Sequence, residues 1–349
     1  MKTILITGGA GFIGSHTCLV LLQNGYNLIV LDSLINSYEE SLSRVKNIIQ
    51  VKDIEEKIEF IKGDIRDKFL LNEIFKKAIN KSQPIEAVVH FAGLKAVAES
   101  IENPLLYWEV NVSGSINLFN VMKENNCRII VFSSSATIYS HLENIPLTED
   151  SPISPSNPYG ETKYTIERIL QGIYRSSTEG WRIINLRYFN PIGAHPSGEI
   201  GEHPFGLPSN IFPYITQVAI GEIERLNIFG SDWPTKDGTG VRDYIHVMDL
   251  AEAHYAAIKL LFTSNSIFQN FNIGTGRGTS VLELVNTFER INNCKIPRRY
   301  IDRRKGDLAS VVADNKLALS SLDWQPQRSI EDMCRDGWNW QKQNPKGFD

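Results

Sequence analysis

The chain has 349 residues, of which 42% are hydrophobic, and its formal net charge is −4. This length predicts two or three domains with enough apolar material for a packed core, and the composition excludes a disordered chain. The net charge is small and spread along the chain, so it does not indicate a surface for nucleic acid or membrane. We therefore expect chemistry on a small molecule.

The cysteines are scattered along the chain. Cys18, Cys127, Cys294 and Cys334 show no CxxC spacing, which favours reduced thiols over a disulfide framework or a zinc site. The first residues lack the apolar run of a signal peptide, and no 18-residue apolar stretch follows. These features predict a cytoplasmic protein.

Short apolar runs alternate with longer helical patterns in the first half of the chain. The runs lie near 4–7, 28–32, 87–93 and 129–135, and they are rich in Ile, Val and Leu. Such alternation is typical of βα units and of a parallel sheet covered on both faces. We predict a Rossmann-like, doubly wound α/β domain over residues 1–186 and a smaller α/β C-terminal substrate domain over 187–349.

The second half of the chain has a different texture. Residues 191–213 and 230–243 are dense in Gly, Pro and Asn, which predicts long functional loops. Helical patterns return at 248–262 and 279–291, and the stretch between them would add one more strand to the first sheet. We therefore expect a segment near 240–274 to return to the first domain.

The most specific local signal is the glycine turn in "ILITGGAGFIGSHT". Gly9, Gly11 and Gly14 satisfy GxGxxG, and Thr7, Gly8, Gly11 and Gly14 satisfy the related TGxxGxxG spacing. A strand precedes the motif and a helix follows it, as a dinucleotide site requires. The glycines permit a tight turn and let a pyrophosphate approach the N–H groups of a helix N-terminus. A glycine-rich turn without a ligand is the alternative.

Asp32 strengthens the dinucleotide interpretation. It ends the second strand, 18 residues after Gly14, where its carboxylate can accept hydrogen bonds from the adenosine ribose diol. The same charge would repel a 2′-phosphate, and the next residue is Ser33 rather than an arginine. The sequence therefore predicts NAD rather than NADP. We expect Phe12 and Ile13 to pack the helix, with their backbone near the phosphates.

Tyr159 and Lys163 lie four residues apart in "PYGETKYT", so a helix starting near Pro158 places both on one face. A solvated polar pair is the alternative, but the position behind a strand ending in "SSSAT" favours acid/base chemistry. Lowering a phenol pKa from ~10 by about 3 units requires roughly 4 kcal/mol. One cation ~4 Å away supplies about that at an effective dielectric constant of ~20. Lys163, helped by the positive nicotinamide ring, is therefore sufficient.

Several of these features together resemble the extended short-chain dehydrogenase/reductase family. They are the segment from Thr7 to Gly14, "HFAG" at 90–93, Asn111, "SSSAT" at 133–137, and Tyr159 with Lys163. Longer blocks, such as "LRYFNPIGAHPSGEIGE" and "GTGVRDYIHVMDLAEAH", are similar to the UDP-hexose 4-epimerases of that family. The likeness runs from about residue 3 to the C-terminus. It implies a UDP-sugar substrate and a homodimer formed through four helices, with no nucleic-acid or membrane partner.

The resemblance also implies a reaction. Tyr159 would take the proton of the sugar 4-hydroxyl while the C4 hydride passes to NAD, and the 4-keto sugar would turn over before the hydride returns to its other face. Ser135 would hydrogen-bond the same hydroxyl and help relay the proton. Lys163 would tune Tyr159 and hold the nicotinamide ribose. Thr137 would either contact the sugar or cap the next turn.

The resemblance assigns two sets of binding residues. The cofactor set comprises Gly8, Gly11, Phe12, Ile13, Gly14, Asp32, Ser33, Leu34, Ile35, Asn36, Ser37, Asp64, Ile65, Phe91, Ala92, Gly93, Leu94, Lys95, Asn111, Ser135, Tyr159, Lys163 and Phe189. The substrate set comprises Ser135, Tyr159, Asn190, Asn210, Phe229, Arg242, Arg304, Asp307 and Val311. Asp64 could instead cap a helix.

Two charged groups have competing interpretations. Five basic residues lie between 298 and 305, as in a solvated loop or a nucleic-acid patch, but the resemblance favours Arg304 as a phosphate ligand. His195, Glu199, Glu202 and His203 contain metal-binding side chains, yet they lie in a Gly/Pro loop without helical spacing. We predict no metal site.

The sequence departs from the family pattern at two positions. Ser140 replaces the usual glycine after Tyr139, and Val311 stands where a bulky tyrosine is common in enzymes restricted to glucose and galactose. The smaller Val311 would admit a 2-N-acetyl group, so UDP-GlcNAc and UDP-GalNAc are additional candidate substrates.

Two other activities are possible on this fold. A nucleotide-sugar dehydratase or decarboxylase would place acidic residues where this chain has Ala136 and Thr137. A non-catalytic NAD-sensing protein would have little need of Ser135, Tyr159 and Lys163 together.

Overall fold

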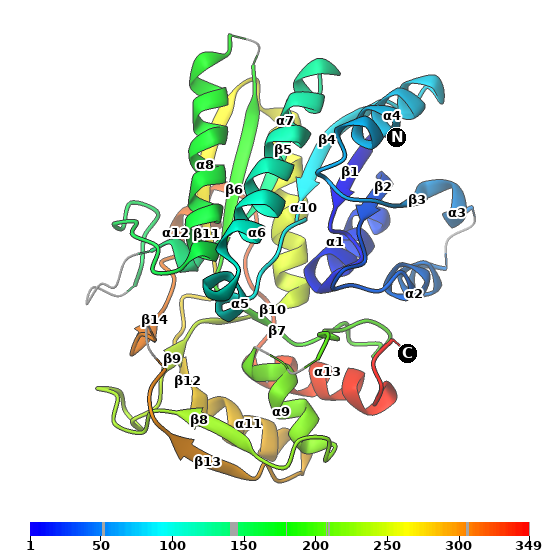
Figure 1. Cartoon of the computed structure of the whole chain (residues 1–349). Coiled ribbons are helices and arrows are strands. Elements are labelled where there is room, and N and C mark those ends of the chain that lie inside the picture. Colours follow the sequence, from blue (N-terminus) through cyan, green and yellow to red (C-terminus); the bar gives the residue numbers. More distant parts are fainter. Residues whose placement is uncertain are drawn as a thin grey trace. The chain divides into compact units, whose positions relative to one another are not determined.

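The computed structural model describes residues 1–50, 53–139, 146–178, 180–206, 208, 210–304 and 307–348. Ser140, one of the two departures from the family pattern, lies outside these residues. The chain divides into two compact units (Figure 1). The first comprises Met1–Ser140, Pro152–Arg187 and Ala251–Phe271, and the second comprises His141–Ser151, Tyr188–Leu250 and Asn272–Asp349. A late segment of the chain thus belongs to the N-terminal unit.

A seven-stranded sheet forms the centre of the described part of the first unit. Its strands are β1 (Thr3–Thr7), β2 (Asn27–Asp32), β3 (Ile58–Lys62), β4 (Ile85–His90), β5 (Ile129–Ser135), β6 (Arg182–Tyr188) and β11 (Ile267–Ile273). Their order is β11-β6-β5-β4-β1-β2-β3, and the pairings from β3 to β5 are parallel. The Rossmann-like prediction is confirmed, including the additional strand β11. The strand order reverses beside β1, where open α/β sheets bind their ligands.

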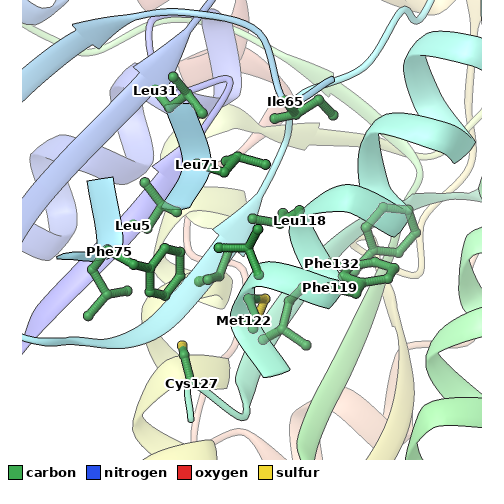
Figure 2. Close-up of a cluster of buried hydrophobic side chains, with 14 of the residues drawn as sticks. Leu5, Leu31, Ile65, Leu71, Phe75, Leu118, Phe119, Met122, Cys127 and Phe132 are labelled. Carbon is green, nitrogen blue, oxygen red and sulfur yellow. The ribbon is translucent and has the colours of Figure 1, made fainter. Parts of the chain in front are cut away.

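Helices pack on both faces of this sheet. They are α1 (Phe12–Gln23), α2 (Glu40–Ile49), α3 (Ile54–Lys57), α4 (Lys68–Asn80), α5 (Val97–Glu102), α6 (Pro104–Tyr107), the π-helix η1 (Trp108–Ser113), α7 (Gly114–Glu124), the 3₁₀ turn η2 (Ala136–Ile138), α8 (Pro158–Ser176) and α10 (Val247–Thr263). Leu5 and Leu31 share one buried cluster with residues of α4, α7 and α8 (Figure 2). The neighbouring side chains of Ile6 and Val30 lie beside Cys18 of α1, on the opposite face. The sheet is therefore covered on both sides.

Helix α8 begins with two local signals. Pro158 occupies its first position, and the Oδ1 atom of Asn157 accepts a hydrogen bond from the N–H of Gly160 at 2.9 Å. Proline suits this position because its missing N–H would have no helical partner, and the asparagine satisfies one of the free donors. The start of α8 is thus fixed immediately before Tyr159.

The second unit contains short strands and four helices in its described part. Parallel pairs form between β7 (Asn190–Ile192) and β10 (Tyr244–His246), and between β8 (Leu226–Phe229) and β13 (Arg298–Ile301). A three-stranded sheet has the order β12 (Thr279–Ser280), β9 (Val241–Arg242), β14 (Ser310–Val311). The helices are α9 (Ile211–Ala219), α11 (Val281–Asn292), α12 (Lys316–Ser321) and α13 (Ile330–Gln343). Phe212, Phe288 and Met333 join α9, α11 and α13 in one buried cluster.

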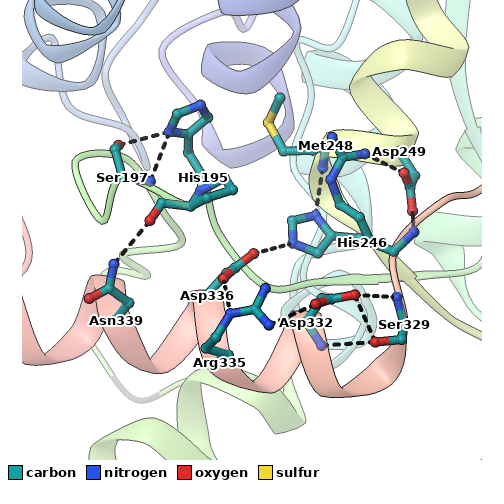
Figure 3. A network of polar contacts seen from close by, with 12 residues as sticks. His195, Ser197, His246, Met248, Asp249, Ser329, Asp332, Arg335, Asp336 and Asn339 are labelled. Atoms are coloured by element: carbon teal, nitrogen blue, oxygen red, sulfur yellow. Dashed lines mark hydrogen bonds and ion pairs between the residues drawn. The ribbon is translucent and has the colours of Figure 1, made fainter.

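A polar network anchors α13 within this unit (Figure 3). The carboxylate of Asp336 lies 3.4 Å from Nε2 of His246, while Ser329 and Asp332 form a reciprocal cap at the start of the helix. The hydrogen bonds from Ser329 lower the pKa of Asp332 to about 2. Within the described ranges, no helix is long and apolar enough to cross a membrane.

Candidate functional site

The glycine turn lies at the carboxyl end of β1, where the sheet order reverses. Gly8 has a φ of +73°, and a Cβ there would come 2.6 Å from the backbone nitrogen of Ala92. A Cβ on Gly14 would come 2.4 Å from the carbonyl oxygen of Gly8. Both positions therefore require glycine. Gly11 caps α1 without a side-chain hydrogen bond, so the helix presents backbone N–H groups suited to a phosphate.

The carboxylate of Asp32 is buried and organises the segment beside this turn. It accepts hydrogen bonds from the backbone N–H groups of Ala10 and Leu34 at 2.9 and 3.0 Å, and from the Ser37 hydroxyl at 2.7 Å. A carboxylate has about four acceptor positions, so there is room for one further donor without displacing a partner. Leu34 adopts a left-handed φ of 58° within this loop. Ser33 and Leu34 are partly buried, whereas Ile35 and Asn36 are exposed.

The loop after β4 is held by Asn111 of the π-helix η1. The Oδ1 atom of Asn111 accepts from the N–H of Leu94 at 2.8 Å, and its Nδ2 donates to the carbonyl of Leu94 and to the Thr162 hydroxyl, each at 3.1 Å. Gly93 has a φ of 156° and passes close to the Asn111 side chain. The buried Asn111 thus fixes the loop to α8, while Phe91 and Ala92 are partly buried and Lys95 is exposed.

Ser135, Tyr159 and Lys163 come together in the first unit. Ser135 ends β5, and its Oγ accepts from the N–H and hydroxyl of Thr137 at 3.2 and 3.0 Å. Ser135 also hydrogen-bonds to the Tyr159 hydroxyl. The buried Lys163 donates from Nζ to the carbonyl of Ser133 at 2.7 Å and lies 5.9 Å from the centre of the Tyr159 ring. Three side chains suited to proton transfer therefore converge where β5 meets α8.

The electrostatics of this group differ from the sequence expectation. Burial raises the pKa of Tyr159 to about 12, although its hydrogen bond with Ser135 opposes the shift. Burial also lowers the pKa of Lys163 to about 8, so its ammonium remains mostly charged at neutral pH. The expected lowering of the phenol pKa assumed an ammonium ~4 Å away. Here that ammonium donates a hydrogen bond to the Ser133 carbonyl and lies 5.9 Å from the centre of the Tyr159 ring.

Other residues of the cofactor set lie in the same unit. The Asp64 side chain is hydrogen-bonded by the backbone N–H and guanidinium of Arg66, and Ile65 is buried in the core beneath it. Phe12 packs edge-on against His16 within α1, with 5.2 Å between the ring centres. The Ile65 side chain therefore has a packing role.

Five residues of the substrate set form a cluster in the second unit. Val311 of β14 pairs in register with Arg242 of β9. Arg304 stacks on the Phe229 ring at 4.5 Å and makes an ion pair with Asp307 at 3.0 Å. Burial lowers the pKa of Arg242, Asp307 opposes that shift, and Arg304 adds to it.

This cluster can bind an anion. Arg242 uses Nη1 for hydrogen bonds to the carbonyls of Val241 and Leu308 at 2.8 and 2.9 Å. An arginine has five N–H donors, so several remain for a ligand. The paired guanidinium groups suit a diphosphate, whose oxygens accept forked hydrogen bonds.

Asn190 and Asn210 of the substrate set, and Phe189 of the cofactor set, lie elsewhere in the second unit. The N–H of Asn190 donates to the carbonyl of Asp243, and that of the buried Phe189 donates to Ile273. Asn210 precedes α9 and donates from Nδ2 to the carboxylate of Glu202 at 3.0 Å. In the part of the chain that the structure describes, no hydrogen bond or ion pair joins the Asn210 side chain to the arginine cluster.

The loop with metal-binding side chains has its own hydrogen bonds. Nδ1 of His195 lies 2.7 Å from the Ser197 hydroxyl (Figure 3), and Nδ1 of His203 accepts from the N–H of Phe348 at 3.1 Å. Among the residues that the structure describes, no group of three or more potential ligands is gathered for a metal ion.

Sequence reasoning missed a buried contact chain behind the glycine turn. Nδ1 of His90 lies 2.6 Å from the Thr7 hydroxyl, and Nε2 lies 2.8 Å from the Ser115 hydroxyl. Burial lowers the pKa of His90 to about 3, so the ring is neutral. "HFAG" marks this histidine, but its partners come from segments far away in the sequence.

Comparisons with known proteins agree with this geometry. The family model described as GDP-mannose 4,6 dehydratase matches residues 5–337. The UDP-glucose 4-epimerase of Bacillus subtilis (strain 168) is 49% identical over 345 residues, which cover 99% of this chain and 98% of that protein. A bifunctional UDP-glucose and UDP-xylose 4-epimerase of Pisum sativum is 49% identical over 348 residues, which cover 99% and 97%.

Solved structures give the same result. The UDP-glucose 4-epimerase from Stenotrophomonas maltophila, with bound NAD and formylated UDP-arabinopyranose, has a TM-score of 0.94 and 42% identity, covering 99% of both chains. The enzyme from Bifidobacterium longum, in complex with NAD⁺ and UDP, has a TM-score of 0.91 and 41% identity, covering 99% of this chain and 100% of that one.

Proposed function

The chain belongs to the family of UDP-glucose 4-epimerases, and we propose that its two units bind NAD and a UDP-hexose and interconvert UDP-galactose and UDP-glucose. The observation that carries this proposal is the convergence of Ser135, Tyr159 and Lys163 at the end of β5, within a unit that also contains a dinucleotide-type turn.

The first unit fits NAD. Gly8 and Gly14 leave space at the turn that a Cβ would fill, and the uncapped start of α1 suits the pyrophosphate. Asp32 retains one acceptor position for a ribose hydroxyl, and its charge disfavours a 2′-phosphate. When bound, NAD takes up the hydride of the sugar C4 and gives it back. This cycle has no net redox change, so we expect the cofactor to stay bound between turnovers.

Tyr159 is proposed as the base that takes the proton of the sugar 4-hydroxyl and later returns it. Ser135 already hydrogen-bonds the Tyr159 hydroxyl, so it is placed to relay a proton between the sugar 4-hydroxyl and the Tyr159 oxygen. Lys163 contributes a positive charge that stabilises the phenolate of Tyr159. Asn111 holds the loop after β4, which contains five expected cofactor contacts, against α8.

The dehydratase description of the family model does not fit the end of β5. Elimination of water from the sugar needs acidic groups beside the catalytic hydroxyl, whereas η2 begins with Ala136 and Thr137. Thr137 instead donates its hydroxyl to Ser135. The residues present therefore favour epimerisation over dehydration. A purely NAD-sensing protein would not need the three catalytic side chains Ser135, Tyr159 and Lys163, so their presence favours an enzyme.

The second unit is proposed to hold the nucleotide sugar. Arg242 and Arg304 would bind the diphosphate, with Phe229 and Asp307 orienting Arg304. Asn190 and Asn210 are proposed as further contacts of the nucleotide sugar, and Phe189 is proposed as a contact of the cofactor.

N-acetylated UDP-sugars are a second candidate substrate class. Val311 pairs in register with Arg242, so its short side chain stands beside the proposed diphosphate ligand. A residue of this size leaves more room than a tyrosine would. Turnover of UDP-GalNAc alongside UDP-galactose would support this assignment, and its complete absence would contradict it.

We also propose an oligomeric state and a cellular location for the protein. Leu105 is 82% exposed and Ile101 is 63% exposed, and both lie with Ile116 on the run of helices from α5 to α7. An apolar patch of this kind suits a second copy of the chain, so we propose a homodimer. All four cysteines are free thiols, which suits the cytoplasm.

The test is an incubation of the purified protein with UDP-galactose and no added NAD, with UDP-glucose followed by a coupled dehydrogenase. Turnover would support both the reaction and a retained cofactor. Absence of turnover, even after NAD is supplied, would contradict the proposed reaction.

A further inference from the structure

A buried ion pair lies about two helical turns beyond Tyr159 on the catalytic face of α8. Arg187 of β6 donates from Nε and Nη2 to the carboxylate of Glu167, at 3.0 and 2.8 Å. The side chains are 2% and 4% exposed, so the pair is almost completely removed from water. Neither residue belongs to the proposed catalytic or binding sets.

Three residues of α8 contact three consecutive serines of β5. Tyr159, Lys163 and Glu167 are spaced i, i+4, i+8, so they share one helix face. Ser135 hydrogen-bonds Tyr159, the carbonyl of Ser133 accepts from Lys163, and the hydroxyl of Ser134 donates to Glu167. The last two contacts measure 2.7 and 2.5 Å. Glu167 thus makes the third contact between α8 and β5, and the first two contacts are made by Tyr159 and Lys163 of the proposed catalytic group.

Arg187 links this series to the turn that follows β5. Its Nη1 donates to the Tyr139 hydroxyl at 2.9 Å, and Tyr139 is the residue that ends η2. Ser135 begins the same turn. One guanidinium therefore holds the helix through Glu167 and the far end of the serine turn through Tyr139.

The first turn of α8 and the turn η2 are closely packed. A Cβ on Gly160, the neighbour of Tyr159, would come 2.8 Å from the carbonyl oxygen of Thr137 in η2. The first turn of α8 therefore lies directly against η2. A shift of either element would alter the separation of Tyr159 from Ser135.

A buried ion pair is a poor way to stabilise a core. Desolvation of two charges often cancels their attraction, and apolar residues of similar volume commonly stabilise as well or better. The forked geometry of the guanidinium does, however, fix direction and distance in a way that apolar contacts do not. The ion pair of Glu167 and Arg187 is therefore suited to fixing the position of α8, and with it Tyr159, relative to Ser135 at the end of β5.

We propose that Glu167 and Arg187 are positioning residues that hold the catalytic face of α8 in register with the end of β5. This inference rests on the proposed epimerase function. Its direct consequence is that removing the pair impairs the chemical step more than it impairs folding or ligand binding.

The test compares the wild type with the paired variant Glu167→Met/Arg187→Met, which removes both charges and leaves neither uncompensated. We expect a Tm close to that of the wild type. We expect kcat for UDP-galactose to fall about 100-fold, the loss typical of a misplaced catalytic group. KM and the content of bound NAD should change by less than about threefold. A folded variant with wild-type kcat would overturn the proposal.

Leu118→Ala is the control for a purely apolar loss of packing. Leu118 is fully buried in the same core but belongs to α7, outside the polar series of α8. It lowers stability without touching the ion pair, so its kcat should stay near the wild-type value at temperatures where it is folded. An equal loss of kcat in this control would mean that reduced stability, rather than register, explains the effect.

A second readout does not depend on turnover. The pKa of Tyr159 can be followed by tyrosinate absorbance, as the difference between each protein and the same protein carrying Tyr159→Phe. Loss of register should raise this pKa in the paired variant, whereas an unchanged value would contradict the proposal. An inactive wild type would refute the proposed function, and this titration would still decide the positioning role.

A milder variant decides the matter if the paired variant does not fold. Ser134→Ala removes only the hydroxyl that donates to Glu167. We expect a severalfold lower kcat with an unchanged Tm. Wild-type kcat in this variant would overturn the proposal.

Discussion

Replacement of Lys163 by methionine should raise the pKa of Tyr159 and make activity strongly dependent on pH. Burial places the pKa of this phenol at about 12 without a cofactor. A base that works at pH 7 requires a fall of about 5 units, which corresponds to about 7 kcal/mol. Positive charges near the phenol must therefore supply this stabilisation.

Lys163 supplies part of it. Its ammonium lies 5.9 Å from the centre of the Tyr159 ring, and two unit charges separated by roughly that distance interact by about 2.8 kcal/mol at an effective dielectric constant of ~20, or about 2 pKa units. The remaining stabilisation, about 4 kcal/mol, is what one further cation in contact provides, and the oxidised nicotinamide ring carries such a charge. Lys163→Met should therefore lower kcat at pH 7 about 100-fold.

The assay is kcat for UDP-galactose from pH 6 to pH 9. Below the raised pKa, activity of the variant should rise about tenfold per pH unit and approach the wild-type value near pH 9. Lys76→Met, on the exposed surface of α4, is the matched control and should behave as the wild type. Bound NAD is measured after denaturation, because Lys163 is also proposed to hold the cofactor. A loss of activity that is equal at pH 7 and pH 9, with NAD retained, would refute the electrostatic argument.

Three further substitutions test separate parts of the site. Tyr159→Phe should lower kcat about 10²- to 10⁴-fold and leave NAD binding intact, and activity near the wild-type level would exclude Tyr159 as the base. Gly14→Ala places a Cβ 2.4 Å from a backbone oxygen and should cost about 1–3 kcal/mol or more, seen as a lower Tm and less bound NAD. Gly172→Ala in α8, which has open space around it, is its control and should not lower the Tm. Val311→Tyr should reduce turnover of UDP-GalNAc at least about tenfold relative to UDP-galactose, and an unchanged ratio would separate Val311 from substrate choice.

The sequence predicts those features that depend on neighbouring residues. The turn at Gly8 and Gly14 follows a strand and precedes a helix, and both elements can be recognised in the residues beside the motif. The common face of Tyr159 and Lys163 follows from helical spacing, and Pro158 marks where that helix begins. The late strand β11 was also predicted, because its apolar run lies between two helical patterns.

Features that depend on distant segments were not predicted. Asp32 was expected to accept hydrogen bonds from the ribose diol, but Ala10, 22 residues earlier, and the nearby Leu34 and Ser37 already occupy most of its acceptor positions. The sequence argument also did not predict that the Ser133 carbonyl accepts a hydrogen bond from the Lys163 ammonium. These contacts arise when strands and loops meet in three dimensions, and local patterns do not encode them.

The same limit applies to short strands and to buried ion pairs. β9, β12 and β14 contain two residues each, which is too short for any alternation to be seen. Glu167 and Arg187 are 20 residues apart and meet because β6 lies beside β5 in the sheet. Helical spacing places Glu167 on the face of Lys163, but nothing in the sequence indicates its partner.

The central claim is that the sugar C4 gives up a hydride and receives it back within one bound complex. UDP-galactose labelled with deuterium at C4 tests it directly, with the product analysed by NMR. Transfer of the hydride to NAD and back predicts UDP-glucose that keeps the deuterium at C4, without exchange with solvent. Loss of the label to water would contradict it, because a proton would then have been removed from carbon instead of a hydride.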